Sequence, residues 1–383
     1  MSSNISEKLS KNFKIALVAG EESGDQLGGP LMKSLKSQFP KATFIGVGGP
    51  LMIREGLDSF FPIEKISLMG IIEPLLKLPE LIKLRSQLKR FFLEQKPDLF
   101  IGIDSPDFNL PISRFIKNNL NTRTVQYVSP SIWAWRKGRL KVIEKSVDSV
   151  LTLFPFEEES YKNSSIKVRY VGHPLAYKLG PHRDRRNARL DRGIEDDQKA
   201  IALLPGSRRS EVSLMAGPII EASKMIKEKD ASTKFFMPLV EKKHRSFIPD
   251  NLDTQHINFS YGDSQEILSL SDIGIVTSGT VSLEALLVRT PVVVVYKTNW
   301  LNYAIIKPLL NTKHFSLPNL ISGQDLLPEL LQTEVTPLNI FNSYQKFYQD
   351  RIKFCLEEFE KIHSQLKAGG SEKASEAIAE MFR

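Results

Sequence analysis

The chain has 383 residues, a formal net charge of +8 and 41% hydrophobic residues, with 25% charged and 9% aromatic side chains. This composition excludes a disordered chain, and the length exceeds the usual size of one domain, so two domains are expected. Cys355 is the only cysteine, which excludes an internal disulfide or a cysteine metal cluster and is typical of a reducing compartment.

The N-terminal segment MSSNISEKLSKNFK is polar and lacks an apolar core of signal-peptide length, so a loose leader is expected. No run of about 18 apolar residues follows, so no transmembrane helix is expected. The positive charge favours anionic partners, namely nucleic acid, phosphorylated ligands or an acidic membrane surface.

Short apolar runs then alternate with helical patterns through the first half of the chain. Strands are predicted at residues 13–20, 42–49, 98–104, 123–129, 149–156 and 168–172, with a helix at 25–39. This alternation predicts a parallel sheet with helices on both faces. The polar, arginine-rich segment 180–198 is interpreted as a solvated connector rather than a phosphate-binding patch.

The alternation restarts in the second half of the chain. Strands are predicted at residues 199–207, 233–240, 257–262, 272–279 and 291–297, and helical periodicity follows. We therefore expect an α/β protein with two Rossmann-like parallel-sheet domains, at 1–180 and 181–335, that face a cleft. Residues 336–383 are expected to form C-terminal helices.

Glycine-containing turns follow three of the predicted strands, where open parallel sheets bind their ligands. The first turn, AGEESGDQLGG, carries Glu21 and Asp25 and matches neither the dinucleotide fingerprint nor a Walker A loop. It is equally consistent with carboxylates at the cleft and with an acidic helix cap.

The second and third turns are predicted to bind anions. In LLPGSRRSEV, Ser207 is expected to cap a helix and Arg208 to donate to a phosphate, so diphosphate binding is favoured. In IVTSGTVSLEALL, Ser278, Gly279 and Thr280 precede an apolar helix. Glu284 in that helix either binds sugar hydroxyls or compensates the helix dipole.

Two aspartates stand three residues apart in LFIGIDSPDFNL. Asp104 ends a predicted strand, whereas Asp107 lies at a helix start behind Ser105-Pro106. Because no histidine cluster accompanies them, a general base at Asp104 and a helix-start role for Asp107 are favoured over a metal site.

Two aromatic or histidine-containing segments leave alternatives open. Trp133 and Trp135 in YVSPSIWAWRKGRLKVI fit a strand-like segment, and core packing is favoured over stacking with nucleic-acid bases. His173 in VGHPL is a candidate for the cleft, although a lone histidine is more often structural.

The segment 66–92 is both apolar and basic. The residues that define this pattern are Leu75, Leu76, Leu78, Leu81, Ile82, Lys83 and Arg85. It fits a helix resting on an anionic membrane and, equally, an amphipathic helix packed on the sheet.

A series of motifs resembles the lipid-A-disaccharide synthase family. In chain order these are LVAGEESGD, GVGGPLM, MGIIEPL, GIDSPDFN, YVSPSIWAWR, VGHPLA, LLPGSRRSEV, SGTVSLEALL and SLPNLISG. The resemblance implies a GT-B glycosyltransferase that joins UDP-2,3-diacylglucosamine to 2,3-diacylglucosamine 1-phosphate with inversion, giving a β-1,6-linked disaccharide phosphate and UDP. It implies no metal and no cofactor, and a place on the cytoplasmic face of the bacterial inner membrane. It is compatible with a homodimer.

The resemblance also implies roles for individual residues. Asp104 would deprotonate the acceptor 6-hydroxyl, Glu21 would be a second active-site acid, and Arg208 with Ser207 would meet the donor phosphates. The nucleotide site would comprise Ser278, Gly279, Thr280, Glu284 and Asn319. The first domain would bind the lipid acceptor and the second the UDP-sugar.

Two other functions compete with this interpretation. A UDP-sugar 2-epimerase would share the two-domain fold and the UDP site without an acyl-binding surface. A nucleic-acid binder would use the aromatic and basic stretch at 127–143, and this is the less favoured alternative.

Overall fold

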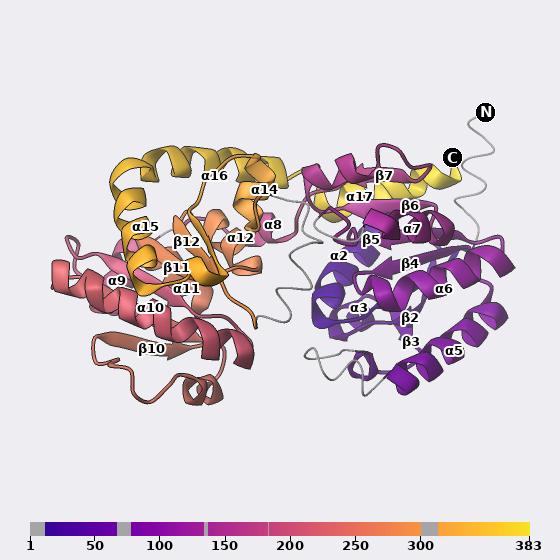
Figure 1. Ribbon diagram of the computed structural model, residues 1–383. Helices are drawn as coiled ribbons and strands as arrows, with labels where there is room; N and C mark the ends of the chain where they lie inside the picture. The colour runs from indigo at the N-terminus through magenta and orange to yellow at the C-terminus, as the bar shows by residue number, and fades with distance from the viewer. Residues whose placement is uncertain (1–11, 67–77, 134–136, 183, 300–312) are drawn as a thin grey trace. The chain divides into compact units, whose positions relative to one another are not determined.

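The computed structural model describes residues 12–66, 78–133, 137–182, 184–299 and 313–383 (Figure 1). The chain divides into two compact units, each described here by itself. Unit 1 comprises Met1–Pro174 and Lys367–Arg383, and unit 2 comprises Leu175–Leu366.

Unit 1 is built on a seven-stranded sheet in the order β3-β2-β1-β4-β5-β6-β7, in which all neighbouring strands run parallel. The strands are β1 Lys14–Ala19, β2 Thr43–Val47, β3 Leu57–Ser59, β4 Leu99–Ile103, β5 Arg123–Tyr127, β6 Ser149–Thr152 and β7 Lys167–Tyr170. Strands β1 and β4 are almost fully buried, as expected of apolar runs covered on both faces.

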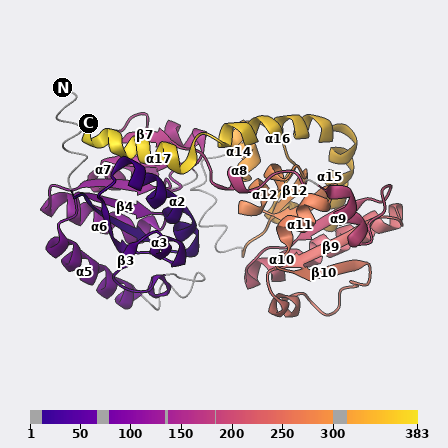
Figure 2. The ribbon, with the colours of Figure 1, turned by 180° about the vertical axis from the view of Figure 1, so that it is seen from behind.

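Helices cover both faces of this sheet (Figures 1 and 2). They are α2 Glu22–Gln38, α3 Pro50–Arg54, α5 Leu78–Gln95, α6 Pro106–Asn119, α7 Leu140–Ser146 and α17 Gly370–Ala379. One apolar cluster joins α2 and α17 to the sheet, and a second joins α5 and α6. Short 3-10 helices lie at Ile63–Lys65, Lys137–Arg139, Pro155–Tyr161 and Glu380–Phe382.

Unit 2 has a six-stranded parallel sheet in the order β10-β9-β8-β11-β12-β13. Its strands are β8 Ala200–Leu204, β9 Lys234–Leu239, β10 Ile257–Tyr261, β11 Ile273–Thr277, β12 Val292–Tyr296 and β13 Glu329–Leu331. Its helices are α8 Leu175–Lys178, α9 Arg185–Asp191, α10 Arg209–Lys229, α11 Ser264–Leu270, α12 Thr280–Leu287, α14 Leu317–Ser322, α15 Pro337–Asp350 and α16 Ile352–Leu366. Short 3-10 helices lie at Lys242–Phe247 and Gln332–Glu334.

The units differ from the expected division in two places. The segment at 180–198 is largely exposed, but it is not a connector between the units, because it lies within unit 2 and forms α9 there. The buried Arg189 of α9 donates to the carbonyls of Leu270 and Gln198 at 2.7 and 2.6 Å. The C-terminal helices are not one region either. Helices α15 and α16 belong to unit 2, whereas α17 belongs to unit 1 and packs on α2.

Phe382 shows why α17 belongs to unit 1. Its ring packs edge-on against Phe13 and Phe39, with centroids 4.9 and 5.9 Å away.

None of the helices that the structure describes combines the length and the hydropathy needed to span a bilayer.

Asp25 lies in α2 and is 3% exposed. Its carboxylate accepts hydrogen bonds from the backbone N–H groups of Gly49, Leu51 and Met52 at 2.9, 3.0 and 3.0 Å. It therefore caps the N-terminus of α3 from a neighbouring helix. Asp25 thus acts as an acidic cap, but for α3 rather than for the helix after β1, which is the cap that the sequence predicted.

Replacing Asp25 with alanine is expected to lower the free energy of unfolding by ~3 kcal/mol, because three backbone donors, two of them buried, lose a charged acceptor. Urea unfolding followed by circular dichroism measures the change. Asp58→Ala, which removes an exposed carboxylate from β3 of the same unit, is the control. Equal losses in the two variants would contradict the capping role.

Candidate active site

The sheet of unit 1 changes direction between β1 and β4. These strands pair with each other, but the chain continues from β1 to one side of the sheet and from β4 to the other. Loops leaving the carboxyl ends of two such strands diverge and leave a crevice, which is where open α/β sheets bind ligands. Glu21 follows β1 and Asp104 follows β4.

The structure thus brings the two predicted catalytic carboxylates to neighbouring strand ends. Glu21 is exposed and stands at the N-cap of α2, whereas Asp104 is half-buried. Ser23, in the first turn of α2, donates its hydroxyl to Asp104 Oδ2 at 3.1 Å. Sequence reasoning missed Ser23, although its position in the same turn as Glu21 is a usable signal.

The backbone at Asp104 is unusual. Asp104 and Ser105 have φ angles of +52° and +39°, in the left-handed region that non-glycine residues rarely adopt. The turn also lies against Gly20, where a Cβ would stand 2.1 Å from Ser105 Oγ. Glycine at position 20 is therefore required for the two loops to approach this closely.

Asp107 lies in the first turn of α6, as expected. Its exposed carboxylate forms an ion pair with Arg139. The helix begins at Pro106, with Ser105 at the N-cap. The structure thus confirms that Asp104 follows the strand and that Asp107 lies at the start of the helix. The role of Asp104 as base stays a prediction.

Aromatic side chains gather at the carboxyl ends of β5, β6 and β7. Trp133 packs edge-on against Phe156, which stacks on Phe154, which in turn stacks on the His173 ring at 5.2 Å. Burial lowers the pKa of His173 to about 4, so its ring is neutral at physiological pH. Trp133 lies in a turn rather than a strand, because β5 ends at Tyr127, and Trp135 lies outside the described residues.

A buried carboxyl, Glu157, supports this cluster and was missed by sequence reasoning. It is 4% exposed and accepts backbone N–H bonds from Leu153 and Phe154, both at 3.0 Å. Burial raises its pKa to about 7, while these bonds and one from the Trp133 side chain oppose the rise. The glutamate two residues after Pro155, at a helix start, is the signal that could have found it.

The raised pKa of Glu157 makes stability depend on pH. The folded-state value of about 7 exceeds the ordinary 4.5, so the group favours the fold fully below about pH 4.5 and loses this contribution as pH rises through 7. Relative to Glu157→Gln, the wild type is expected to lose ~3 kcal/mol of stability between about pH 5 and pH 8. Urea unfolding across this range measures it. The exposed Glu159, changed to glutamine, should give no such difference.

Unit 2 repeats the change of direction between β8 and β11. After β8, the backbone N–H groups of Ser207 and Arg208 donate to Glu211 Oε2 at 2.9 and 3.2 Å. The expected cap by the Ser207 hydroxyl is therefore wrong. Helix α10 begins at Arg209, and the carboxylate of Glu211, a charged acceptor, reaches back to these amides instead.

Arg208 also pairs with Glu211, at 3.1 Å, while 69% of its side chain stays exposed. Tyr296, at the end of β12, lies close enough that the Glu211 charge adds to burial in raising the pKa of its phenol. His244 is buried behind the loop and its Nε2 donates to the Ser207 carbonyl at 2.9 Å. Sequence reasoning missed both residues because they come from other elements.

The loop after β11 lies at the neighbouring strand end. The N–H of Ser278 donates to the Val295 carbonyl at 2.9 Å, which continues the sheet, and its hydroxyl donates to the Phe315 carbonyl at 3.3 Å. Gly279, with φ +157°, and Thr280 are exposed at the start of α12. Burial raises the pKa of Glu284, which is half-buried in the same helix.

The remaining predicted residues are spread over other elements. Asn319 is 1% exposed, and its amide bridges the N–H and carbonyl groups of Leu327 at 2.7 and 2.9 Å. This is a structural contact, so the predicted UDP contact of Asn319 stays a prediction. Within the described ranges, no group of three histidine, cysteine, aspartate or glutamate side chains is arranged to hold a metal ion.

Helix α5 carries the predicted acyl-contact residues that the structure describes. Leu81 packs against the sheet core, Ile82 and Lys83 are exposed, and Arg85 donates to the Asp107 carbonyl at 3.4 Å. Leu75, Leu76 and the side chain of Leu78 lie outside the described residues. The face of α5 that carries Leu81 therefore packs on the sheet, which was one of the two predicted alternatives. Membrane contact stays a prediction for the exposed face that carries Ile82 and Lys83.

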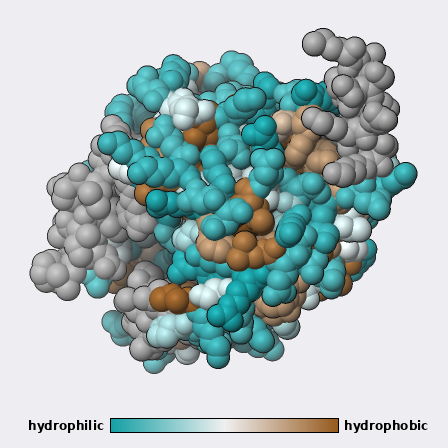
Figure 3. All heavy atoms as spheres, turned by 90° about the vertical axis from the view of Figure 1, so that its right-hand side faces the viewer, coloured by the Kyte–Doolittle hydropathy of each residue, from teal (hydrophilic) through white to brown (hydrophobic). Residues whose placement is uncertain are grey.

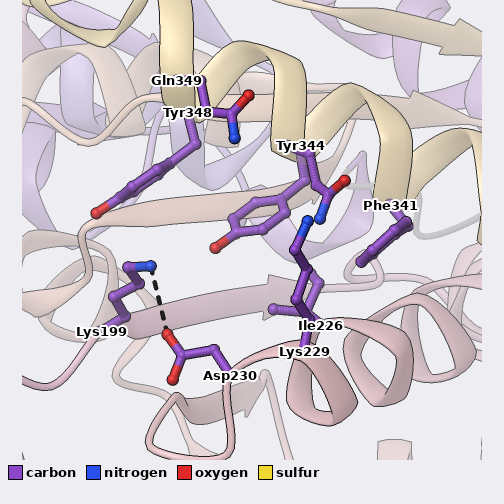
Figure 4. A pocket seen from close by; sticks show the side chains of 9 residues that line it. Lys199, Ile226, Lys229, Asp230, Phe341, Tyr344, Tyr348 and Gln349 are labelled. Atoms are coloured by element: carbon purple, nitrogen blue, oxygen red, sulfur yellow. Dashed lines mark ion pairs between the residues drawn. The ribbon is translucent and has the colours of Figure 1, made fainter.

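A pocket of about 270 Å³ in unit 2 lies away from these strand ends (Figure 4). Tyr344 and Tyr348 of α15 point toward the Lys199–Asp230 ion pair, whose atoms are 3.3 Å apart. Lys199 precedes β8, so the pocket stands at the amino end of that strand. It is therefore distinct from the β8/β11 crevice.

The comparisons with known proteins agree with this geometry. The family model described as lipid-A-disaccharide synthetase matches residues 15–381. The chain belongs to this family.

Curated relatives support the same assignment. The lipid-A-disaccharide synthase of Alcanivorax borkumensis is 42% identical over 373 residues, covering 96% of this chain and 97% of the relative. That of Idiomarina loihiensis is 40% identical over 369 residues, covering 95% and 97%. Membership of the lipid-A-disaccharide synthetase family makes the chain a glycosyltransferase enzyme of lipid A biosynthesis.

Solved structures support the fold. A glycotransferase of kitacinnamycin aligns with a TM-score of 0.61 at 14% identity, over 96% of this chain and 98% of that one. UDP-GlcNAc 2-epimerase from Neisseria meningitidis aligns with a TM-score of 0.63 at 14% identity, over 96% and 99%. The predicted GT-B fold is confirmed, while the epimerase is similar in fold alone.

Proposed function

We propose that the protein transfers 2,3-diacylglucosamine from UDP to the 6-hydroxyl of 2,3-diacylglucosamine 1-phosphate, releasing UDP. The observation that carries this is the place of Asp104 at the β1/β4 crevice of a chain in this family. Ser23 holds one oxygen of its carboxylate and leaves the other to accept the proton of the acceptor hydroxyl.

The proposed reaction is a single displacement in which UDP leaves as the acceptor hydroxyl attacks. The acceptor O6 attacks the anomeric carbon as the bond from that carbon to the UDP phosphate oxygen breaks, and the O6 proton passes to Asp104. Attack opposite the leaving group inverts the centre, so an α donor gives the β-1,6 product. Glu21, exposed beside Asp104, is a second acid that orients the acceptor sugar.

Unit 2 supplies the donor site in this proposal. The exposed guanidinium of Arg208 meets the charge that develops on the leaving diphosphate, without a metal or cofactor. Ser207 belongs to the loop after β8 that also carries Arg208. Facing the nucleotide from the end of the neighbouring strand, β11, would be Ser278, Gly279 and Thr280. Glu284 and Asn319 complete the UDP site, with Glu284 accepting from hydroxyls.

We place the reaction at an anionic membrane, on the cytoplasmic face of the inner membrane, because both substrates carry acyl chains. The residues that would contact it are Leu75, Leu76, Leu78, Leu81, Ile82, Lys83 and Arg85. The face in Figure 3 is mostly hydrophilic, with hydrophobic side chains in small separate patches, so attachment would be peripheral. Nucleic acid is not a partner in this proposal.

The test is acceptor-dependent UDP release from acylated donor and acceptor, with the product identified by mass spectrometry. The expected result is one disaccharide phosphate per UDP, with no release when either substrate is omitted. Conversion of UDP-GlcNAc to UDP-ManNAc without an acceptor would replace the proposal with the epimerase alternative.

A further inference from the structure

Strained backbone is concentrated at the carboxyl ends of two paired strands in unit 1. Asp104 and Ser105 follow β4 with φ of +52° and +39°, and Val128 follows β5 with φ of +78°. A positive φ costs free energy, most for a β-branched residue such as valine. Such strain persists only where the surrounding structure holds it.

Asn109 holds the turn from α6. Its side chain is 0% exposed, and Nδ2 donates to the Asp104 carbonyl at 2.9 Å. The same nitrogen lies 3.2 and 3.3 Å from the carbonyls of Val18 and Ile103. The amide therefore ties the turn after β4 to the end of β1.

Gln126 holds the same carbonyl from β5. It too is 0% exposed, and Nε2 donates to the Asp104 carbonyl at 3.0 Å. It also lies 3.3 Å from the carbonyl of Val128, the other strained residue. The two amides thus converge on one peptide group, the one between Asp104 and Ser105.

Stability alone is a poor explanation for these amides. Asn109 Oδ1 and Gln126 Oε1 are buried and have no hydrogen-bond partner in the part of the chain that the structure describes. Gly102 lies against them, since a Cβ there would stand 2.8 Å from Asn109 Cβ and 3.0 Å from Gln126 Oε1. Buried unpaired oxygens destabilise a fold, so their presence points to a geometric purpose.

We infer that Asn109 and Gln126 are positioning residues that clamp the Asp104 carbonyl and so aim the Asp104 carboxylate at the acceptor hydroxyl. This rests on the proposed function, in which Asp104 is the base. Without the clamp the turn relaxes toward negative φ, and the carboxylate rotates away from Ser23 and from the reacting oxygen.

The primary test is Gln126→Met, which keeps the length of the side chain and removes its donor. It is expected to lower kcat for UDP release by ~10²-fold, the loss typical of a catalytic group displaced by about 1 Å, with little change in KM. Thr124→Val is the matched control. Thr124 lies on the same strand, is 0% exposed and donates to Asp148 at 3.1 Å, so its loss should lower stability and leave kcat unchanged.

A double-mutant cycle separates positioning from general damage. If Gln126 acts through Asp104, adding Gln126→Met to Asp104→Ala changes the residual rate less than twofold. A further ~10²-fold loss in that background would overturn the inference.

Hydrogen exchange tests the clamp without substrate. The Asp104 N–H donates to the Tyr127 carbonyl at 2.9 Å, and its exchange should accelerate at least tenfold in Gln126→Met and not in Thr124→Val. Unchanged exchange would overturn the clamp even if the wild type were active. An inactive wild type with accelerated exchange would instead overturn the proposed function. Asn109→Leu, and Gln126→Glu where methionine prevents folding, repeat the measurement.

Discussion

Replacing Asp104 with alanine is expected to lower kcat for UDP release by ~10²–10⁴-fold, the usual contribution of a positioned general base. The carboxylate is half-buried at the end of β4 and bonded to Ser23 at 3.1 Å, so its loss removes the base of the proposed mechanism. Steady-state UDP release with saturating acylated substrates measures the effect.

The control for Asp104→Ala is Asp107→Ala. Asp107 is exposed and pairs with Arg139, so this variant should keep kcat within about twofold, as an exposed ion pair contributes little. UDP binding, measured by calorimetry, should be equal in both variants because the donor loops lie in unit 2. Full activity in Asp104→Ala would remove Asp104 from the mechanism.

Replacing Arg208 with alanine is expected to raise the barrier by ~2–4 kcal/mol, which is roughly 30- to 10³-fold in kcat. The side chain is 69% exposed and its pairing with Glu211, at 3.1 Å, is a surface contact, so the guanidinium is available to a leaving diphosphate. Loss of the guanidinium should lower kcat and also weaken UDP binding.

Arg209→Ala is the matched control for Arg208. The Arg209 guanidinium lies over the Phe247 ring at 5.5 Å, so its removal should change packing and leave kcat nearly unchanged. Arg208→Lys keeps the charge but not the forked donors, and we expect it to recover only part of the rate. Equal losses in the two alanine variants would point to general surface charge rather than to a specific phosphate contact.

The sequence predicted the strands well because buried parallel strands are continuous apolar runs. Strands β1, β4, β8 and β11 all lie within predicted ranges, and Asp104 follows β4 as expected. The order of the strands in the sheet could not be predicted the same way. It depends on which side each connection crosses, and that order places Glu21 and Asp104 at neighbouring strand ends.

Side chains that act across elements were the main omissions. Gln126 and Asn109 look like ordinary polar residues of a strand and a helix, and only the fold brings both to one carbonyl. The Ser207 cap was wrong because hydroxyl propensity was weighed without the competing carboxylate of Glu211. Likewise, the sequence pattern did not distinguish the buried Arg189, which the fold places against backbone carbonyls, from the exposed arginines beside it.

The return of α17 to unit 1 has a consequence for biosynthesis. Unit 1 includes Lys367–Arg383, so the ribosome releases its last part only after all of unit 2 has been made. Until then, the side of α2 that α17 covers, with Phe13 and Phe39, has no native cover. The nascent chain must therefore keep an apolar surface from aggregating, which makes this unit a natural client for chaperones during translation.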